Sequence, residues 1–299
     1  MASKIPWTEQ TWNPVSGCTK ISAGCLNCYA ERMAKRLQAM GQERYRNEFK
    51  VTLHREALDE PFHWKKPRKI FVCSMGDLFH EKVPFDFIDR VMAVITLCHW
   101  HTFQILTKRE KTMFEYFNQP DLWTYHVPNA MNEFWRHKGI REPLLDYIYF
   151  NGAESIGGHP GRECKLEANT EIIHNPLPNI WLGVSVENEK NLHRLNDLIQ
   201  IPTTLRVVSL EPLLSDIYIS DYLKYLQWVI IGAESIGGHP GRECKLEWVR
   251  DLVGQCNAAS VPVFIKQLHI GGKLNKNINE WPKDLQLQEW PKQITFFKE

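Results

Sequence analysis

The chain has 299 residues, of which 43% are hydrophobic and 24% are charged, a balance typical of a globular protein with a sizeable core. Its net charge of +1 does not demand a polyanionic partner, and no apolar run reaches the roughly 18 residues that a bilayer-spanning helix needs. The first twelve residues lack the apolar region of a secretory signal, so we expect a cytoplasmic protein with no membrane partner.

Three of the eight cysteines stand close together near the start of the chain. Cys18, Cys25 and Cys28 lie within eleven residues, with six residues between the first two and two between the last two. A glycine precedes both Cys18 and Cys25, and glycine would let backbone amides approach negatively charged sulfur. An apolar stripe predicts a helix from Tyr29 to Met40, whose N-terminus would lower the pKa of the neighbouring thiols. Because a cytosolic protein rarely holds its cysteines as disulfides, we predict that these three bind metal.

Two kinds of metal site are compatible with this spacing. Three thiolates leave one iron of a [4Fe–4S] cluster without a protein ligand, and that iron can bind S-adenosylmethionine (SAM) and deliver an electron to it. A zinc ion would instead need a fourth ligand from a distant His or Cys. The spacing alone does not separate the two. The lack of a clear fourth ligand nearby, and the acidic residues described below, favour the cluster.

After the cysteines, short apolar runs alternate with segments of helical period. The predicted strands are Lys69–Ser74, Thr102–Leu106, Asn179–Val186, Leu205–Leu210, Trp228–Gly232 and Pro262–Lys266. The predicted helices between and after them include Phe87–Cys98, Glu189–Ile199 and Leu246–Ala258. Alternation of this kind indicates β-α units and a parallel sheet. We therefore expect an α/β fold, a partial or full (β/α) TIM-like barrel, as a single domain over residues 1–299.

Charged residues follow each predicted strand. They are Asp77, Lys108, Glu187, Glu211, Glu234 and Lys266. Parallel α/β folds bind their ligands at the carboxyl ends of the strands, so this set is what the mouth of a barrel would carry. The alternative for each acid is that it caps the following helix.

Two stretches break the regular alternation. Residues from about 111 to 178 contain few β-branched runs, and we expect an insertion there, forming a lid or one side of a substrate pocket. The sixteen residues 152–167 recur identically at 232–247, but their flanks do not match, so the repeat is not a solenoid period. Only the second copy follows a predicted strand and leads into a predicted helix, and we expect it to be the working copy.

Several of these segments together resemble a known family. The matching blocks are Ile5–Thr8, Thr11–Lys20, Gly24–Arg32, Met75–Phe79, Leu106–Arg109, Trp181–Asn188, Ser209–Leu214 and Phe264–Leu268. They closely resemble the phage-associated three-cysteine-motif family, which is largely uncharacterised and looks like a branch of the radical SAM superfamily near spore photoproduct lyase. The resemblance covers most of the chain outside residues 111–178. Radical SAM proteins usually have three residues between their first two cysteines, whereas this chain has six, and its nearest match to their glycine-rich strand end is Met75–Asp77.

The resemblance implies an enzyme that cleaves SAM reductively to a 5′-deoxyadenosyl radical, as a lyase or transferase. It further implies an electron donor such as flavodoxin or ferredoxin, a nucleic acid or nucleotide as substrate, and a place in the phage or bacterial host cytosol. One alternative is a zinc- or cluster-stabilised nucleic-acid-binding protein without catalysis. Another is a degenerate barrel that serves only as a partner subunit.

On this interpretation the residues at the strand ends take individual roles. Asp77 would accept a hydrogen bond from the amino group of SAM, unless it is a helix cap. Lys108 would pair with the SAM carboxylate or a substrate phosphate, unless it is a surface lysine. The three glutamates would hold ribose hydroxyls or substrate, with Glu187 and Glu234 on the cofactor and Glu211 at the reacting centre. Lys266 would face the barrel mouth beside them or pair with a glutamate.

A basic stretch, His63–Lys69, contains an aromatic residue. It could contact a nucleic-acid backbone and stack a base on Trp64. The alternative is a solvated loop that leads into the second strand.

Overall fold

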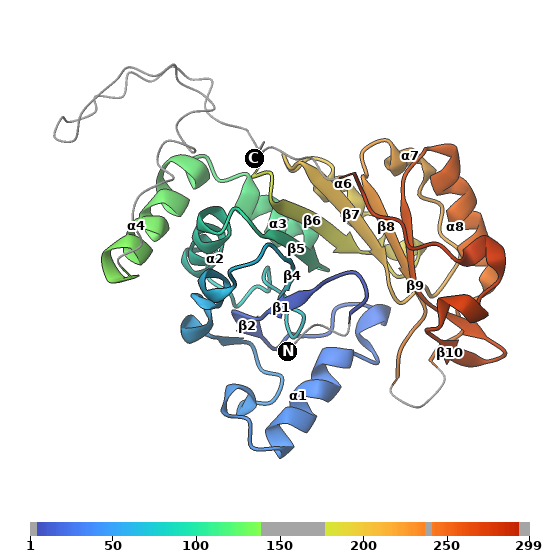
Figure 1. Ribbon diagram of the computed structural model, residues 1–299, viewed down its shortest axis with the longest axis horizontal. Coiled ribbons are helices and arrows are strands. Elements are labelled where there is room, and N and C mark those ends of the chain that lie inside the picture. Colours follow the sequence, from blue (N-terminus) through green and yellow to red (C-terminus); the bar gives the residue numbers. More distant parts are fainter. Residues whose placement is uncertain (1–4, 139–176, 237–240, 293–299) are drawn as a thin grey trace.

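A single mostly parallel sheet organises the molecule. The computed structural model describes residues 5–138, 177–236 and 241–292. In these residues the sheet has eight strands, whose order across the sheet is their order along the chain. They are β1 (Gln10–Trp12), β4 (Lys69–Val72), β5 (Thr102–Thr107), β6 (Ile180–Ser185), β7 (Leu205–Leu210), β8 (Trp228–Gly232), β9 (Val263–Ile270) and β10 (Lys273–Asn275). All neighbouring pairs are parallel except β9 and β10, which are antiparallel. The α/β fold class is confirmed (Figure 1).

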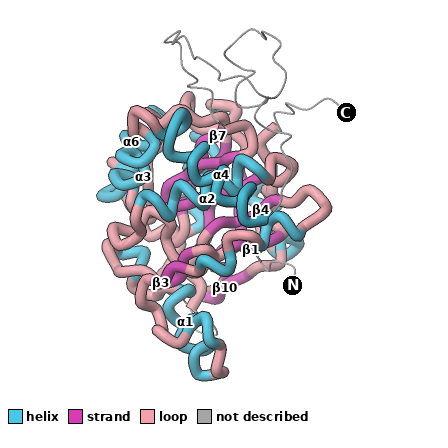
Figure 2. The backbone as a smooth tube through the Cα atoms, turned by 90° about the vertical axis from the view of Figure 1, so that its left-hand side faces the viewer, coloured by secondary structure: helices cyan, strands magenta, loops and turns pink. Residues whose placement is uncertain are grey.

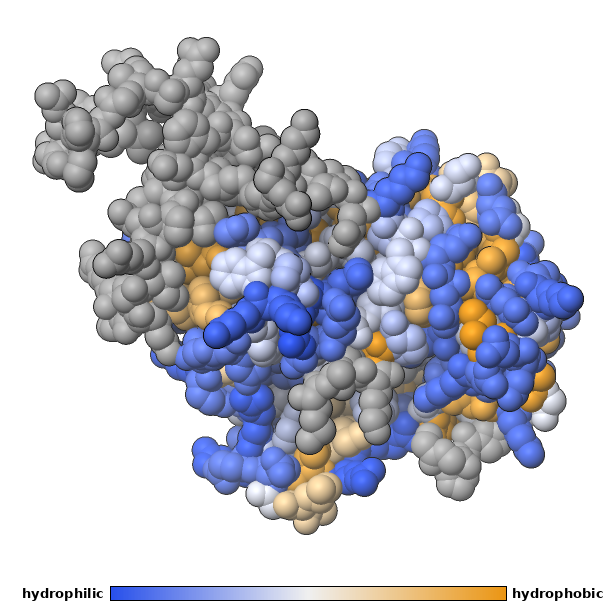
Figure 3. Space-filling model, viewed as in Figure 1, coloured by the Kyte–Doolittle hydropathy of each residue, from blue (hydrophilic) through white to orange (hydrophobic). Residues whose placement is uncertain are grey.

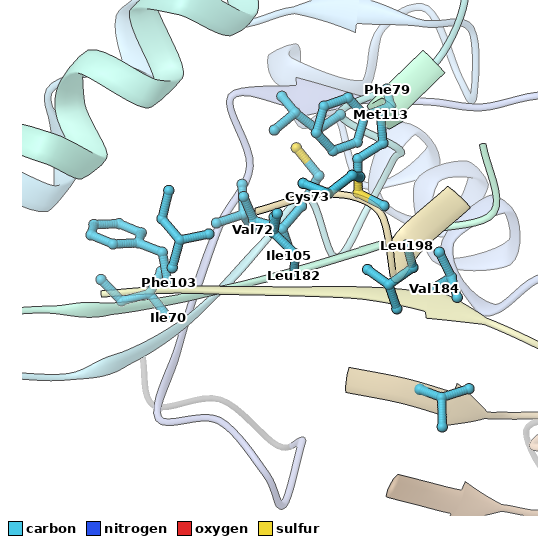
Figure 4. Close-up of a cluster of buried hydrophobic side chains, with 14 of the residues drawn as sticks. Ile70, Val72, Cys73, Phe79, Phe103, Ile105, Met113, Leu182, Val184 and Leu198 are labelled. Atoms are coloured by element: carbon cyan, nitrogen blue, oxygen red, sulfur yellow. The ribbon is translucent and has the colours of Figure 1, made fainter. Parts of the chain in front are cut away.

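The apolar face of each strand explains why these segments form the sheet. Alternate side chains, such as Ile70, Ile105, Val184 and Val208, lie fully or almost fully buried in the main hydrophobic core. Figure 4 shows part of this core, with Ile105 and Leu182 from neighbouring strands between Phe103 and Ile70 on one side and Phe79, Met113 and Leu198 on the other. All six predicted strands are present, four of them with ends shifted by a few residues.

Helices cover the core face of the sheet. They are α2 (Phe85–Leu97), α3 (Glu110–Phe117), α4 (Val127–Lys138), α6 (Arg194–Leu198), α7 (Ser220–Leu223) and α8 (Leu246–Ala258). Buried residues of α2, α3, α6 and α8 belong to the same core as the strands. Figure 2 shows α2 and α4 lying together over the strands. The predicted helices at Phe87–Cys98 and Leu246–Ala258 are confirmed, while Glu189–Ile199 is a short 3-10 turn followed by α6.

The opposite face of the sheet carries aromatic residues at its amino-terminal end. Trp181, Trp228 and Phe264 lie on three strands, and Trp7 packs with them from the segment before β1. The side chain of Trp290 stacks on Trp228, with ring centroids 5.0 Å apart. We call this cluster the aromatic base. It fills the amino-terminal half of that face, and polar residues lie at the carboxyl ends of the strands.

The strands do not close into a barrel. Among the described residues, β1 and β10 are the two edges of the sheet and do not pair with each other. The expectation of a full barrel is therefore corrected to an open sheet. The strand order nevertheless follows the chain without reversal, which is the order of a barrel wall and differs from that of a doubly wound sheet. In the described chain, no helix is both long and apolar enough to cross a bilayer.

Part of the stretch expected to be an insertion belongs to the regular pattern. α3 follows β5 as the ordinary connecting helix and buries Met113 and Tyr116, and α4 packs against α2. The remainder, residues 139–176, lies outside the described residues, and so does the first copy of the repeat at 152–167. The second copy does run from β8 towards α8, as predicted.

The segment between β1 and β4 lies outside the sheet. β2 (Val15–Ser16) pairs with β3 (Thr52–Leu53), and α1 (Tyr29–Ala39) extends away from the body of the molecule (Figure 1). α1 packs through Ala30 and Ala34 against Met75, which follows β4. Met40, just after α1, is exposed. Figure 3 shows apolar atoms at this lower end of the molecule, and further apolar patches between hydrophilic residues on the right-hand side.

Candidate functional site

The cysteine loop, residues 18–28, lies over the carboxyl ends of the strands. The backbone N–H of Gly24 donates to Glu187 Oε1 after β6 at 3.1 Å, and Asn27 Nδ2 donates to Glu234 Oε2 after β8 at 3.2 Å. From the first turn of α1, Arg32 donates to the carbonyl oxygen of Ser235 at 2.7 Å. The chain thus brings the cysteines to the strand-end acids, although more than 160 residues separate them.

The three thiols of this loop differ from the other described cysteines. Cys18, Cys25 and Cys28 are half-buried, whereas Cys73, Cys98, Cys244 and Cys256 are buried in the apolar core. Burial raises the pKa of Cys244 and of Cys256 to about 12, so these core thiols are protonated and inert. The cysteine loop therefore holds the described thiols that are open to metal or to reagents.

Cys18 and Cys25 have opposite pKa shifts. Burial, followed by the charge of Asp77, raises the pKa of Cys18 to about 11, and the neighbouring Arg109 opposes this shift. Burial also acts to raise the pKa of Cys25, but a hydrogen bond from the Ile21 backbone and the charge of Lys108 outweigh it, so the pKa of Cys25 is lowered. Cys25 is therefore the readier of the two to ionise.

Two glycines beside the cysteines have specific structural tasks. Gly17 has a φ of +82°, and a side chain there would collide with the backbone carbonyl of Lys50. A Cβ at Gly24 would come within 3.0 Å of the Glu187 side chain. The amide of Gly24 thus donates to the Glu187 carboxylate, whereas the sequence led us to expect that it approaches sulfur.

Asp77 joins the loops after β4 and β5. Its Oδ1 accepts hydrogen bonds from Thr107 Oγ1 at 2.7 Å and from the Phe79 backbone at 3.1 Å. Its Oδ2 accepts from the Lys108 backbone at 3.3 Å and from Arg109 Nη1 at 3.2 Å. The carboxylate is buried and surrounded by protein donors. It does not cap a helix, because α2 begins at Phe85 with Pro84 as its N-cap residue, so the cap alternative is wrong for Asp77.

Glu187 is fully buried and bonds both the cysteine loop and Arg194 at the start of α6. Arg194 Nη1 donates to its Oε2 at 2.8 Å, and Arg194 Nε lies 3.6 Å from the buried Glu110. Burial acts to raise the pKa of Glu187, but a hydrogen bond from Ser22, the charges of Lys108 and Arg194 and the Gly24 amide together hold it below its usual range. Glu187 is therefore an ionised anchor for the cysteine loop.

Glu234, which follows β8, also anchors the cysteine loop. Arg242 donates to both of its oxygens, through Nε at 3.0 Å and through Nη2. Burial acts to raise the pKa of Glu234, but these bonds, with that from Asn27, lower it. The carboxylate thus joins the Cys25–Cys28 turn to the segment just after the strand.

Glu211 and Lys266 form a pair on the polar face of the sheet. Lys266 Nζ lies 3.2 Å from Glu211 Oε1, as one of the sequence alternatives foresaw. The absence of a side chain at Gly232 makes room for the Glu211 carboxylate.

Lys108 is half-buried, and its charge acts on both Cys25 and Glu187. Among the described residues, no carboxylate lies within 4.0 Å of its Nζ, so it is available to an anionic ligand.

Arg109 is one of the site residues, with Asn27, Arg194 and Arg242, that the sequence analysis did not select. It is 5% exposed and donates through Nη1 to Cys18 Sγ at 3.2 Å and to Asp77. Its Nε donates to Glu81 Oε1 at 2.9 Å and its Nη2 to Thr19 Oγ1 at 2.9 Å. The sequence placed Arg109 directly after Lys108 at a strand end, but nothing local distinguished the two cations.

In the described residues no three His, Cys, Asp or Glu side chains, those of Cys18, Cys25 and Cys28 included, are grouped as ligands of a metal ion. Trp64 of the basic stretch packs against the main core, and its backbone carbonyl accepts a hydrogen bond from Trp100 Nε1 at 3.2 Å. Its ring therefore packs against the fold, while Lys65 and Lys66 beside it are exposed in the loop that leads into β4.

Comparisons with known proteins place the chain in a family but give it no activity. No curated protein and no solved structure matches it. A family model described as a protein of unknown function (DUF5131) matches residues 2–293, which is nearly the whole chain. The chain therefore belongs to the DUF5131 family of proteins of unknown function.

Proposed function

We propose that this chain binds a [4Fe–4S] cluster through Cys18, Cys25 and Cys28 and acts as a radical SAM enzyme. The observation that carries the proposal is the position of the cysteine loop, whose half-buried thiols are held over the carboxyl ends of parallel strands by Glu187 and Glu234. Ligands of parallel α/β folds bind at this end of the sheet. When bound there, the cluster would supply the electron that cleaves the sulfonium of SAM.

We further propose that the open sheet is a partial TIM-like barrel. Support comes from the strand order, which follows the chain, and from the placement of the main core and its helices on one face. The other face carries the aromatic base at one end and the charged strand ends at the other. A cofactor and substrate would therefore enter from the side of the cysteine loop.

The charged residues divide into two groups in this proposal. Asp77, Glu187 and Glu234 are held by protein donors, so they act by fixing the loops around the ligand. Lys108 would bind the carboxylate of SAM or a phosphate of the substrate, because its charge lies beside Cys25. Glu211 and Lys266 would bind the reacting part of the substrate, since the pair lies on the polar face of the sheet.

The substrate class and partners remain part of the proposal. We propose a nucleic acid or nucleotide as substrate and flavodoxin or ferredoxin as electron donor, in the phage or host cytosol. Support for an anionic substrate comes from Lys108, a half-buried lysine whose charge acts on both Cys25 and Glu187.

Anaerobic purification with iron and sulfide tests the proposal. We expect a brown protein with about four irons that forms 5′-deoxyadenosine from SAM and dithionite. Cys25→Ala should abolish iron binding, because two thiolates do not hold the cluster. Cys98→Ala is the matched control, since Cys98 is buried in the core and should leave the iron content unchanged.

Two results would contradict the proposal. If Cys25→Ala binds as much iron as the unaltered protein, Cys25 is not a ligand of the cluster. A colourless protein with one bound zinc would support the alternative of a nucleic-acid-binding protein without catalysis.

A further inference from the structure

Arg109 connects the first cysteine to a buried network of charges. Its guanidinium contacts the Cys18 sulfur, the carboxylates of Asp77 and Glu81, and the hydroxyl and carbonyl oxygens of Thr19. The side chain is almost completely buried, whereas that of Glu81 is 59% exposed. The guanidinium is therefore fixed in place by several partners before any ligand binds.

This fixed orientation matters because of what Nη1 contacts. A single N–H-bearing nitrogen lies 3.2 Å from both Cys18 Sγ and Asp77 Oδ2. The buried carboxylate of Asp77 and the exposed carboxylate of Glu81 already balance the positive charge, so the sulfur contact is not needed to neutralise it. A thiolate at Cys18 would receive a charge-assisted hydrogen bond from a donor that does not have to move.

We infer that Arg109 is a positioning residue that raises the reduction potential of the metal centre bound at Cys18. The inference rests on the proposed function. Hydrogen bonds and positive charge at a ligating sulfur stabilise the more negative, reduced state of an iron–sulfur cluster. The step is a one-electron reduction in which no bond forms or breaks, and dithionite supplies the electron in the test below.

The reduction potential of reconstituted variants tests this role. Arg109→Gln removes the charge and leaves Asp77 and Glu81 uncompensated near the cluster. At a fixed solution potential, we expect its ratio of reduced to oxidised cluster to fall about tenfold, which is about 59 mV for a one-electron couple. Arg109→Lys keeps the charge without the rigid fork and should recover part of the shift.

Two further variants test the direction of the shift in reduction potential and provide a control. Glu81→Gln removes a largely exposed carboxylate that pairs with Arg109, and should shift the potential in the opposite direction, upwards. Arg206→Gln is the matched control, because the half-buried side chain of Arg206 donates to the backbone carbonyls of Leu198 and Ile201. Its reduction potential should equal that of the unaltered protein.

The outcomes distinguish this inference from the proposed function. Iron analysis and spectra of the unaltered protein report on cluster binding, and an absence of iron there would refute the proposed function itself. If the cluster is present and the potentials of Arg109→Gln, Arg109→Lys and Glu81→Gln equal that of Arg206→Gln, the role of Arg109 is refuted. Because Glu81→Gln alters an exposed side chain, the test stands even if Arg109→Gln does not fold.

Discussion

Asp77 joins two neighbouring strand ends at the scale of a single residue. We predict that Asp77→Asn lowers the free energy of unfolding by about 3 kcal/mol, because it leaves the buried Arg109 without a charged partner on that side. Urea unfolding monitored by circular dichroism measures this change. The control is Asp284→Asn, which breaks the exposed ion pair with Arg250 and should leave the urea midpoint unchanged. Equal midpoints for the two variants would mean that the Asp77 network does not stabilise the fold.

At this scale, the sequence identified residues whose type or position along the chain is itself informative. The three cysteines could be selected by spacing, and the strand-end acids by their position after apolar runs. Arg109 could not be selected, because its partners Thr19 and Cys18 lie 90 and 91 residues away along the chain. The difference between a lysine open to ligand and an arginine locked in a network depends on these distant contacts.

At the scale of a single strand, the close packing of β6 against its neighbours leaves no room for a larger side chain at Gly183. A Cβ at Gly183 in β6 would lie 2.6 Å from both Leu106 Cδ2 and the Val207 carbonyl oxygen on the neighbouring strands. We predict that Gly183→Ala lowers the free energy of unfolding by about 1–3 kcal/mol, because the strands must separate.

A second glycine provides the control for this prediction. Gly254 lies inside α8, and a Cβ there would meet no atom within 4 Å. Gly254→Ala should raise the free energy of unfolding by about 0.5–1 kcal/mol through helix propensity. Thermal or urea unfolding compares the two variants. If both alanines stabilise the protein, β6 does not pack as described.

The strands and helices themselves were largely predictable from sequence. The six predicted strands consist of apolar and β-branched runs that belong to a sheet in almost any context. β1 was missed, since its three residues Gln10–Trp12 carry no such run and pair only with β4. The apolar stripe predicted for α1 was partly wrong, because Tyr29 and Met40 are exposed while Ala30 and Ala34 make the contacts.

The stability of the whole molecule should depend on pH through its buried histidines. Burial lowers the pKa of His54, His80 and His101 below the usual 6.5. As the pH falls through 6.5, the unfolded chain takes up protons at these residues and the folded chain does not, so stability falls. We predict a lower urea midpoint at pH 5.5 than at pH 7.5. His101→Gln should reduce this difference, whereas the exposed His63→Gln should leave it unchanged.

The structure supports this choice of test residue. His101 Nδ1 accepts a hydrogen bond from the Arg68 backbone at 3.2 Å, and its Nε2 lies 3.2 Å from the Pro61 carbonyl oxygen, so the ring is neutral with its proton on Nε2. Protonating Nδ1 would break the first of these bonds. The prediction is wrong if His101→Gln shows the same pH dependence as the unaltered protein.

Whether the sheet closes was beyond the reach of the sequence. Alternating strands and helices, and charged strand ends, are common to open sheets and barrels. The distinction lies in whether the first and last strands pair, and here β10 turns back antiparallel on β9 and occupies that edge.

The separation along the chain between Asn27 and Glu234 has a consequence for biosynthesis. The two residues are 207 positions apart, and a ribosome adding 5–20 residues per second needs roughly 10–40 s to cover that distance. During this interval Cys18, Cys25 and Cys28 have left the ribosome without the carboxylates that later hold their loop. Under the proposed function, metal loading would follow synthesis of β8, and a nascent chain arrested before β8 should fail to retain iron.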